Sequence, residues 1–155
     1  MNLEKSREEL LIAWLQKNNF RFNDIDLFDL ALTHSSSPKD DHKNNERLAF
    51  LGDAVLDLLI AELLYTKFSE KDKGSLTEMR KDLVKDEFLA KIGMSKKIDE
   101  IIQMRGVRKD GLQKVIADTI EALIGALFLD KGWDDTKQIL KSFFGGNDFS
   151  KIFID

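Results

Sequence analysis

The sequence predicts an all-α fold, and three observations support that expectation. The chain of 155 residues contains one proline, Pro38, so few positions prevent a helix. Apolar residues recur three and four positions apart over long stretches, which places them on one face of a helix. The apolar fraction of 43% and the charged fraction of 34% are typical of a globular chain. We therefore expect a single helical domain over residues 1–155.

The first part of the chain should form two helices. Residues 3–17 have an apolar face that includes Trp14, and the polar stretch NNFRFND should end this helix. A short second helix is expected over residues 26–33, with Asn23 and Asp24 as plausible N-caps. The polar segment 35–45 should then cross the surface as a loop.

A third helix is expected over residues 45–67. Between residues 48 and 64 its apolar side chains surround nearly the whole cylinder, so it should be the central buried helix. It nevertheless contains Glu46, Asp53 and Asp57 on one face, at positions i, i+7 and i+11. Ala49, at i+3, lies on the same face between Glu46 and Asp53. Acids in a buried helix require an explanation.

The second half of the chain should form further helices. Residues 73–94 predict one helix, with Ser75 as N-cap and Glu78 completing a capping box. Three more helices are expected over residues 96–102, 112–129 and 133–144. The closing stretch GGNDFSKIFID is interpreted as the end of the domain.

A second pair of acids lies in the apolar helix expected over residues 112–129. Asp118 and Glu121 stand at i and i+3, so their carboxylates share one face. Buried carboxylates must be neutralised, paired with bases or bound to a metal. If these acids converge with those of the third helix, the all-oxygen site suits Mg²⁺ or Mn²⁺ better than Zn²⁺, and phosphodiester hydrolysis is its natural chemistry. Alternatively, the acids simply reach the surface at helix ends.

Residues 104–114 form a basic stretch that contains two glycines and the single acid Asp110. Its cations are Arg105, Arg108, Lys109 and Lys114. The composition indicates a flexible loop, which is either simply solvated or in contact with nucleic-acid phosphates. The net charge of -4 argues against an indiscriminate nucleic-acid binder.

Four stretches of the chain resemble the ribonuclease III family. NNERLAFLGDAVLDLL, residues 44–59, is similar to the family signature, which is usually written ERLEFLGD, and IADTIEALIGALFLD resembles the second catalytic segment. LALTHSS and GSLTEMRKDLV resemble two further motifs. The motifs span about residues 27–133 in the family's order and at its separations, so the resemblance is specific.

The resemblance implies a helical endonuclease domain that forms a homodimer and cleaves double-stranded RNA in a shared cleft. Family members use Mg²⁺ and leave 5′-phosphates and short 3′ overhangs. By position, Asp53, Asp118 and Glu121 match the metal-binding acids. Asp53 and Glu121 match the residues usually described as the active site, and Glu46 matches a signature acid near the cleft and the dimer interface. Asp57 matches no catalytic position and is interpreted as peripheral.

Several other residues carry expectations, some from this resemblance and some from the residue type alone. Phe50 matches an aromatic residue that inserts into the partner subunit, although an intrachain core position is equally compatible with the sequence. The four cations of the basic stretch become candidates for phosphate contacts with A-form RNA. Gly52 should permit close approach of two helices, and His34 should be structural.

Two positions depart from the family pattern. Ala49 occupies the position of a metal-ligating glutamate, and a methyl group cannot bind a cation. Lys73 stands where members often have an acid, which is a weaker departure. Because the other cluster acids are intact, a single recent or deliberate change is favoured over long decay. We expect the chain to be inactive or weakly active for this reason.

Besides a double-stranded RNA endonuclease, the sequence leaves one other function open and excludes another. One is a non-catalytic module of the same fold that binds RNA or scaffolds an assembly. The other, a carboxylate-bridged di-iron bundle, is excluded because neither His34 nor His42 follows a glutamate by three residues.

The cellular setting is expected from what the sequence lacks. It has no cysteine, no apolar run long enough for a membrane span, and a charged start, MNLEKSREELL, in place of a signal peptide. We therefore expect a cytoplasmic protein without a membrane partner. No double-stranded RNA-binding domain is expected in the short stretch after residue 144.

Overall fold

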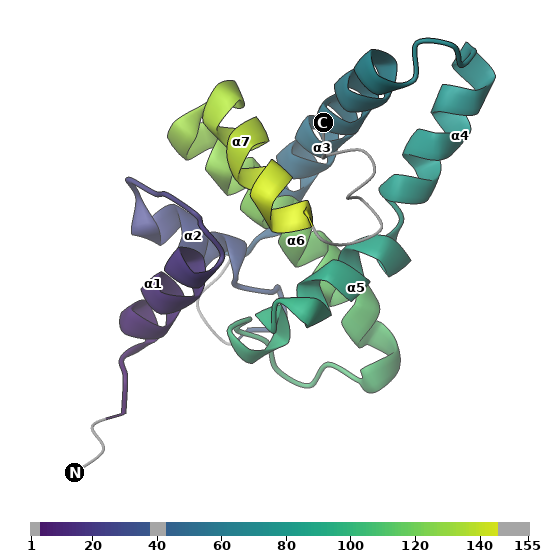
Figure 1. Cartoon of the computed structure of the whole chain (residues 1–155). Helices are drawn as coiled ribbons and strands as arrows, with labels where there is room; N and C mark the ends of the chain where they lie inside the picture. Colours follow the sequence, from purple (N-terminus) through teal and green to yellow (C-terminus); the bar gives the residue numbers. More distant parts are fainter. Residues whose placement is uncertain (1–3, 38–42, 146–155) are drawn as a thin grey trace.

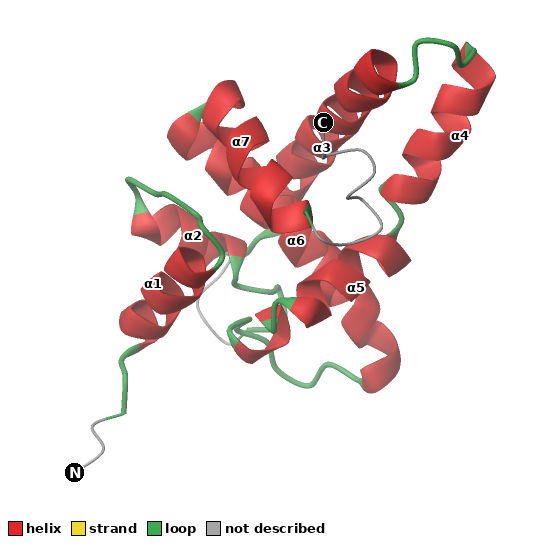
Figure 2. Cartoon of the chain, viewed as in Figure 1, coloured by secondary structure: helices red, strands yellow, loops and turns green. Residues whose placement is uncertain are grey.

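The computed structural model describes residues 4–37 and 43–145, which fold into seven α-helices and two 3₁₀ turns (Figure 1). Within these ranges no β-strand occurs (Figure 2), and the only isolated bridge joins Thr33 to Gln103. The elements are α1 (Arg7–Lys17), α2 (Ile25–Ala31), α3 (Glu46–Lys67), α4 (Lys73–Leu83), α5 (Asp86–Ser95), η1 (Ile98–Glu100), η2 (Lys109–Gly111), α6 (Leu112–Lys131) and α7 (Trp133–Phe144). The expected all-α fold is confirmed.

The long helices α3 and α6 cross at the centre of the fold (Figure 1). Their backbones touch at two glycines. A Cβ added to Gly52 would lie 1.6 Å from the carbonyl oxygen of Glu121, and one added to Gly125 would lie 2.3 Å from that of Leu48. The expectation that Gly52 permits close helix approach is confirmed, and this approach brings acids of α3 and α6 into one neighbourhood.

The remaining helices pack around this pair. α2, α5 and α7 pack on α6, whereas α4 turns back along α3 and has no fully buried residue. The aromatic side chains of Trp14, Phe20 and Phe143 meet in the core between α1 and α7. Burial of these rings contributes much of the favourable free energy that holds the first helices in place.

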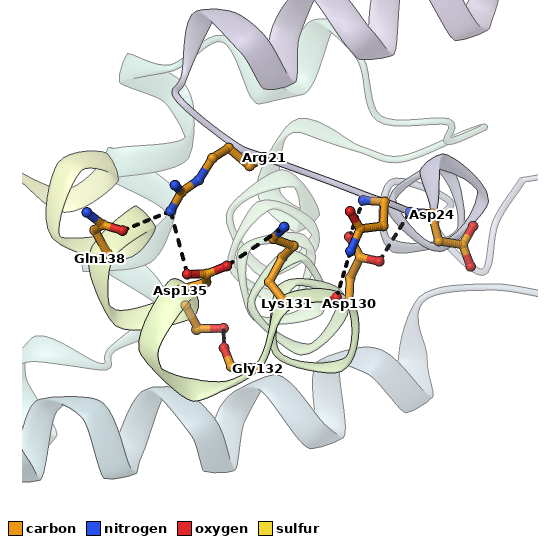
Figure 3. A network of polar contacts seen from close by, with 9 residues as sticks. Arg21, Asp24, Asp130, Lys131, Gly132, Asp135 and Gln138 are labelled. Carbon is orange, nitrogen blue, oxygen red and sulfur yellow. Dashed lines mark hydrogen bonds and ion pairs between the residues drawn. The ribbon is translucent and has the colours of Figure 1, made fainter.

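A polar network ties the start of α2 to the junction of α6 and α7 (Figure 3). The Asp130 carboxylate accepts the backbone N–H groups of Asn23 at 2.7 Å and Asp24 at 3.1 Å. The Asp24 carboxylate in turn accepts from the first turn of α2, which confirms Asp24 as its N-cap. Arg21 extends the network to Asp135 on α7.

The bounds of the first three helices differ by a few residues from the predicted ones, and α2 begins at Ile25, one residue earlier than expected. α1 begins at Arg7 and not at residue 3, because Ser6 and Glu9 form a capping box. α2 ends at Ala31, two residues before its predicted end, because Thr33 enters the bridge to Gln103. α3 begins at Glu46, one residue after its predicted start.

The single helix predicted over residues 73–94 is wrong, because the chain forms two helices there. α4 ends at Leu83 and α5 starts at Asp86, so that α5 can pack on α6 and bury apolar residues such as Leu89. Ser75 is not the N-cap of α4. Asp72 occupies that position and accepts the Ser75 N–H at 2.7 Å.

The bounds of the helices after η1 agree with the predicted bounds to within two residues, whereas η1 itself is shorter than predicted. The helix predicted over 96–102 is the 3₁₀ turn η1, preceded by Lys97 in a left-handed conformation with φ of 57°. α6 continues two residues beyond its predicted end, and α7 has its predicted bounds. Pro38 of the expected surface loop, and the closing stretch from residue 146, lie outside the described residues. None of the described helices is long and apolar enough to cross a lipid bilayer.

Candidate functional site

An open pocket of about 400 Å³ lies where α3, α5 and α6 meet the segment before α3. Its lining contains every candidate metal or catalytic residue predicted from the sequence. The residues are Glu46, Ala49, Phe50 and Asp53 from α3, Asp86 from α5, Lys114, Asp118 and Glu121 from α6, and His34, Ser35 and Asn45 from the preceding segment. The structure therefore brings the two acidic helices together.

The start of α3 is held in place by a buried polar residue. Asn45 is 2% exposed, and its side-chain amide donates to the carbonyl oxygen of Ala31 and to Thr119 Oγ1. These contacts join the end of α2, the start of α3 and the middle of α6. Glu46 and Ala49, which follow directly on α3, are thereby oriented toward the pocket.

Their positions in apolar helices had suggested that these acids are buried in a dry interior. In the structure they are not. Glu46 and Asp53 are exposed on the pocket side of α3, and Asp118 and Glu121 are partly buried. The buried residues of α3, such as Leu56 and Leu59, lie on other faces of the helix. Asp57 lies along the helix from Asp53 and forms an ion pair with Arg80 on α4 at 3.9 Å, consistent with a peripheral acid.

Negative charge accumulates in this pocket. Partial burial, together with the carboxylates of Asp53 and Asp118, raises the pKa of Glu121 from 4.5 to about 7. The pKa of Asp53 is also raised, first by partial burial and then by Asp57 and Asp86. Each acid thus makes ionisation of its neighbours more costly.

Lys114 is the cation of the pocket lining. Its ammonium group donates to Asp118 at 2.9 Å and lies 3.9 Å from Asp86. The hydrogen bond to Asp118, more than any other effect, raises the pKa of Lys114. Lys114 therefore lies on α6 among the acids and not on the basic loop with which it was grouped.

The donor set has the chemistry of a hard divalent cation, because carboxylates outnumber the lining cation. Among the described residues, however, no three acidic or histidine side chains converge closely enough to form a ready-made cage. Mg²⁺ typically binds through one or two carboxylates and keeps several waters, which fits such an open arrangement. Asp53 and Glu121, on facing helices, are the residues that could hold it, with Asp118 beside them. Ala49 offers no oxygen.

Phe50 is 83% exposed at the edge of the pocket. The alternative that Phe50 belongs to the intrachain core is therefore wrong. An aromatic side chain in water forgoes the favourable free energy of burying its apolar surface. Leu58 and Tyr65, also on α3, are 58% and 77% exposed.

The basic segment lies beside the pocket without lining it, apart from Lys114. Arg105, Arg108 and Lys109 are all exposed. Arg105 is held through its backbone, whose N–H donates to Ser36 Oγ at 3.0 Å. Lys109 lies in η2, directly before α6.

Comparison with known proteins assigns the family. Residues 24–146 match the family model described as Ribonuclease-III-like. The chain belongs to the ribonuclease III family. The resemblance found in the sequence motifs is thereby confirmed over most of the chain.

Two relatives within the ribonuclease III family are similar in sequence to most of this chain. Ribonuclease 3 of Francisella tularensis subsp. novicida is 39% identical over 127 residues, which cover 81% of this chain and 54% of that protein. Ribonuclease 3 of Mycoplasmopsis synoviae is 39% identical over 142 residues, covering 88% of this chain and 62% of that protein. The chain thus spans little more than half the length of these relatives.

Solved structures of ribonuclease III relatives show the same fold. The nuclease domain of ribonuclease III from Campylobacter jejuni, described for flexibility in a region involved in dimer formation, superposes with a TM-score of 0.76 at 38% identity. The match covers 84% of this chain and 94% of that one. Dicer from Pichia stipitis matches with a TM-score of 0.65 at 32% identity, covering 80% and 56%.

Two lining residues were missed by sequence reasoning about this ribonuclease III domain. Asp86 faces the acids of α3 and α6, but the predicted continuous helix over 73–94 gave no sign that a new helix starts there. Asn45 was predicted only as the start of a helix. His34, expected to be structural, also lines the pocket.

Removing the charge of Glu121 should stabilise the metal-free domain at neutral and higher pH. A carboxyl whose folded pKa is about 7 binds its proton more tightly than in the unfolded chain, so stability falls as pH rises from 4.5 to about 7. The shift corresponds to at most about 3 kcal/mol, which solvent screening of a partly exposed group reduces to about 1 to 2 kcal/mol. Glu121→Gln should gain that amount at pH 8 in EDTA and almost nothing at pH 4.5, measured by urea unfolding.

The control for this measurement is Glu70→Gln, the same chemical change at an exposed site between α3 and α4. It should leave the difference in stability between pH 4.5 and pH 8 as it is in the parent chain. Equal pH profiles for the parent and Glu121→Gln would show that neither burial nor the neighbouring carboxylates raise the pKa of Glu121.

Proposed function

We propose that this chain is an endonuclease domain that hydrolyses double-stranded RNA as a homodimer with Mg²⁺, or Mn²⁺, as cofactor. The observation that carries the proposal is the pocket in which Asp53, Asp118 and Glu121 meet on a chain of the ribonuclease III family. Such chemistry leaves 5′-phosphates and short 3′ overhangs in the products.

The residues of the pocket have distinct roles in this proposal. Asp53 and Glu121 hold the cation from facing helices, and Asp118 supports them while paired with Lys114. Glu46, exposed at the start of α3, lies at the edge where the substrate phosphate enters. A divalent cation bound there would supply a water of lowered pKa and would stabilise negative charge on the phosphate oxygens.

Substrate binding needs surfaces beyond the pocket. The exposed cations Arg105, Arg108 and Lys109 contact backbone phosphates, which suits recognition of A-form RNA by shape and charge. Phe50 inserts into a second copy of the chain, which removes its exposed ring from water. Two pockets would then serve the two strands of one duplex.

Ala49 limits the activity of the chain as it stands. It lines the pocket between Glu46 and Asp53, where a glutamate would add an oxygen ligand. We infer that the chain binds the cation weakly and cleaves slowly for this reason. The second candidate function is therefore a non-catalytic module of the same fold that binds RNA, and the missing ligand at Ala49 is the observation that favours it.

The test is incubation of a long RNA duplex with the chain and with its Ala49→Glu variant, in Mg²⁺ and in EDTA. The proposal expects Mg²⁺-dependent cleavage by the variant, 5′-phosphate ends, and no cleavage of a DNA duplex of equal sequence. If neither protein cleaves but both bind the RNA duplex, the non-catalytic module is the correct function. If neither cleaves nor binds, both functions are wrong.

A further inference from the structure

His34 is a partly buried side chain in the pocket lining that the proposed chemistry leaves without a role. It directly follows the bridge between Thr33 and Gln103. Its backbone N–H donates to the Gln103 carbonyl at 2.9 Å, and the Gln103 N–H donates to the Leu32 carbonyl at 2.8 Å. The segment with His34 and the start of the basic segment are therefore joined by backbone hydrogen bonds.

Ser36 fixes the imidazole ring of His34. The Ser36 backbone N–H donates to His34 Nδ1 at 3.1 Å, so Nδ1 is an acceptor in this contact. Ser36 Oγ lies 2.8 Å from the same nitrogen and accepts the Arg105 N–H at 3.0 Å. Because Oγ is an acceptor toward Arg105, its own hydrogen is available for Nδ1.

This arrangement determines which ring nitrogen carries the proton. A nitrogen that accepts from Ser36 has its lone pair in use, so the proton of the neutral ring is on Nε2. Nε2–H is then the donor that the ring can offer to a ligand in the pocket. The same Ser36 side chain anchors the basic segment at Arg105.

We propose that His34 Nε2–H binds a phosphate oxygen of the RNA backbone at the edge of the acidic pocket, and that Ser36 is a positioning residue for both His34 and the basic segment. The proposal rests on the proposed function, since the phosphate belongs to the RNA substrate. A phosphate entering among carboxylates needs donors to offset their repulsion, and an N–H group in the same pocket lining as Glu46 and Asp53 is such a donor. Ser36 would hold that donor at a set distance from the cations that follow Gln103.

Two variants separate the roles of the two residues. His34→Asn keeps an acceptor near the position of Nδ1 for Ser36 but removes the Nε2 donor. Ser36→Ala keeps the ring but removes the hydroxyl that joins it to Arg105. Ser37→Ala is the matched control, because the backbone N–H of Ser37, which this change keeps, donates to the His34 carbonyl oxygen at 2.9 Å.

Binding of a 5′-labelled RNA duplex should be measured in EDTA, where no cleavage occurs. His34→Asn should weaken binding about tenfold, the usual effect of losing one hydrogen bond to a charged group, and Ser37→Ala should not. In the RNA-free protein, ¹⁵N NMR should show the Nε2–H tautomer of His34, with a shift of that nitrogen on adding duplex. Ser36→Ala should speed exchange of the Arg105 amide hydrogen at least about tenfold, an effect that His34→Asn should not have.

The outcomes distinguish this proposal from the proposed function. If the parent chain binds duplex and His34→Asn binds equally well, the donor role is wrong and the nuclease proposal stands. If the proton is on Nδ1, or the Arg105 amide exchanges equally in Ser36→Ala, the positioning role is wrong. If the parent chain binds no RNA duplex, the proposed function and the donor role both fail, and the NMR and exchange results still decide the role of Ser36.

Discussion

Ala49→Glu should raise the rate of RNA duplex cleavage in millimolar Mg²⁺ by about 100-fold or more. The position faces the pocket between Glu46 and Asp53, so the new carboxylate would complete a set of ligands on α3 and α6. Loss of a metal-orienting group typically costs 10 to 100-fold in affinity or activity, and a direct ligand should matter at least as much. The gain should appear in single-turnover rates, measured with the enzyme in excess of the duplex and above the dissociation constant of their complex.

The matched control is Ala54→Glu, which makes the same change on an exposed part of α3 outside the pocket lining. It adds one negative charge to the helix but no ligand to the site. We expect no gain in cleavage from it. A gain as large as that of Ala49→Glu would mean that charge, and not coordination, is responsible.

The same variant has a second readout that needs no RNA. Without metal, another carboxylate in this pocket adds repulsion, and two like charges ~4 Å apart repel by about 1 kcal/mol in water and ~4 kcal/mol at an effective dielectric of about 20. The Ala49→Glu variant should therefore melt at a lower Tm than the parent in EDTA. Mg²⁺ should narrow the gap, because it stabilises the form that binds it. Equal melting curves in EDTA would show that position 49 does not face the other acids.

The convergence of α3 and α6 was accessible to sequence reasoning because it depends on periodicity. Asp53 on α3, and Asp118 and Glu121 on α6, fall on the sides of two apolar helices that line the pocket, and the family motifs indicate that these sides meet. Gly52 was accessible for a related reason, since a glycine in a helix has a cost that close packing can offset. These features are local patterns on single helices.

Features that depend on contacts between distant segments were not accessible. Asp86 reaches the pocket because the chain breaks after Leu83 to pack α5 on α6, and that break depends on tertiary contacts. The same packing brings Lys114 of α6 to within 3.9 Å of Asp86 of α5. The hydrogen bonds among His34, Ser36 and Arg105 join distant parts of the chain, since Ser36 and Arg105 are 69 residues apart.

Gly52→Ala should be the most destabilising methyl group that can be added to this domain's α3–α6 interface. The new Cβ would lie 1.6 Å from the Glu121 carbonyl oxygen and 2.8 Å from the Gly125 backbone nitrogen. Both are backbone atoms, so the clash cannot be relieved by a rotamer change and α3 must move away from α6. We expect the free energy of unfolding to fall by about 3 kcal/mol or more, the upper end for overpacking.

Gly74→Ala is the matched control for this change, because it also adds one methyl group to a helical glycine. A Cβ added at Gly74 would lie 3.6 Å from Asp72 Oδ1, which is an ordinary van der Waals distance. Alanine also favours the helix more than glycine does. Gly74→Ala should therefore leave stability unchanged or raise it by up to about 1 kcal/mol. Urea unfolding of both variants measures the difference, and similar stabilities would show that α3 and α6 do not touch at Gly52. Since that contact also sets the distance from Asp53 to Glu121, an Ala49→Glu enzyme that carries Gly52→Ala should lose most of its Mg²⁺-dependent cleavage even at a temperature where it remains folded.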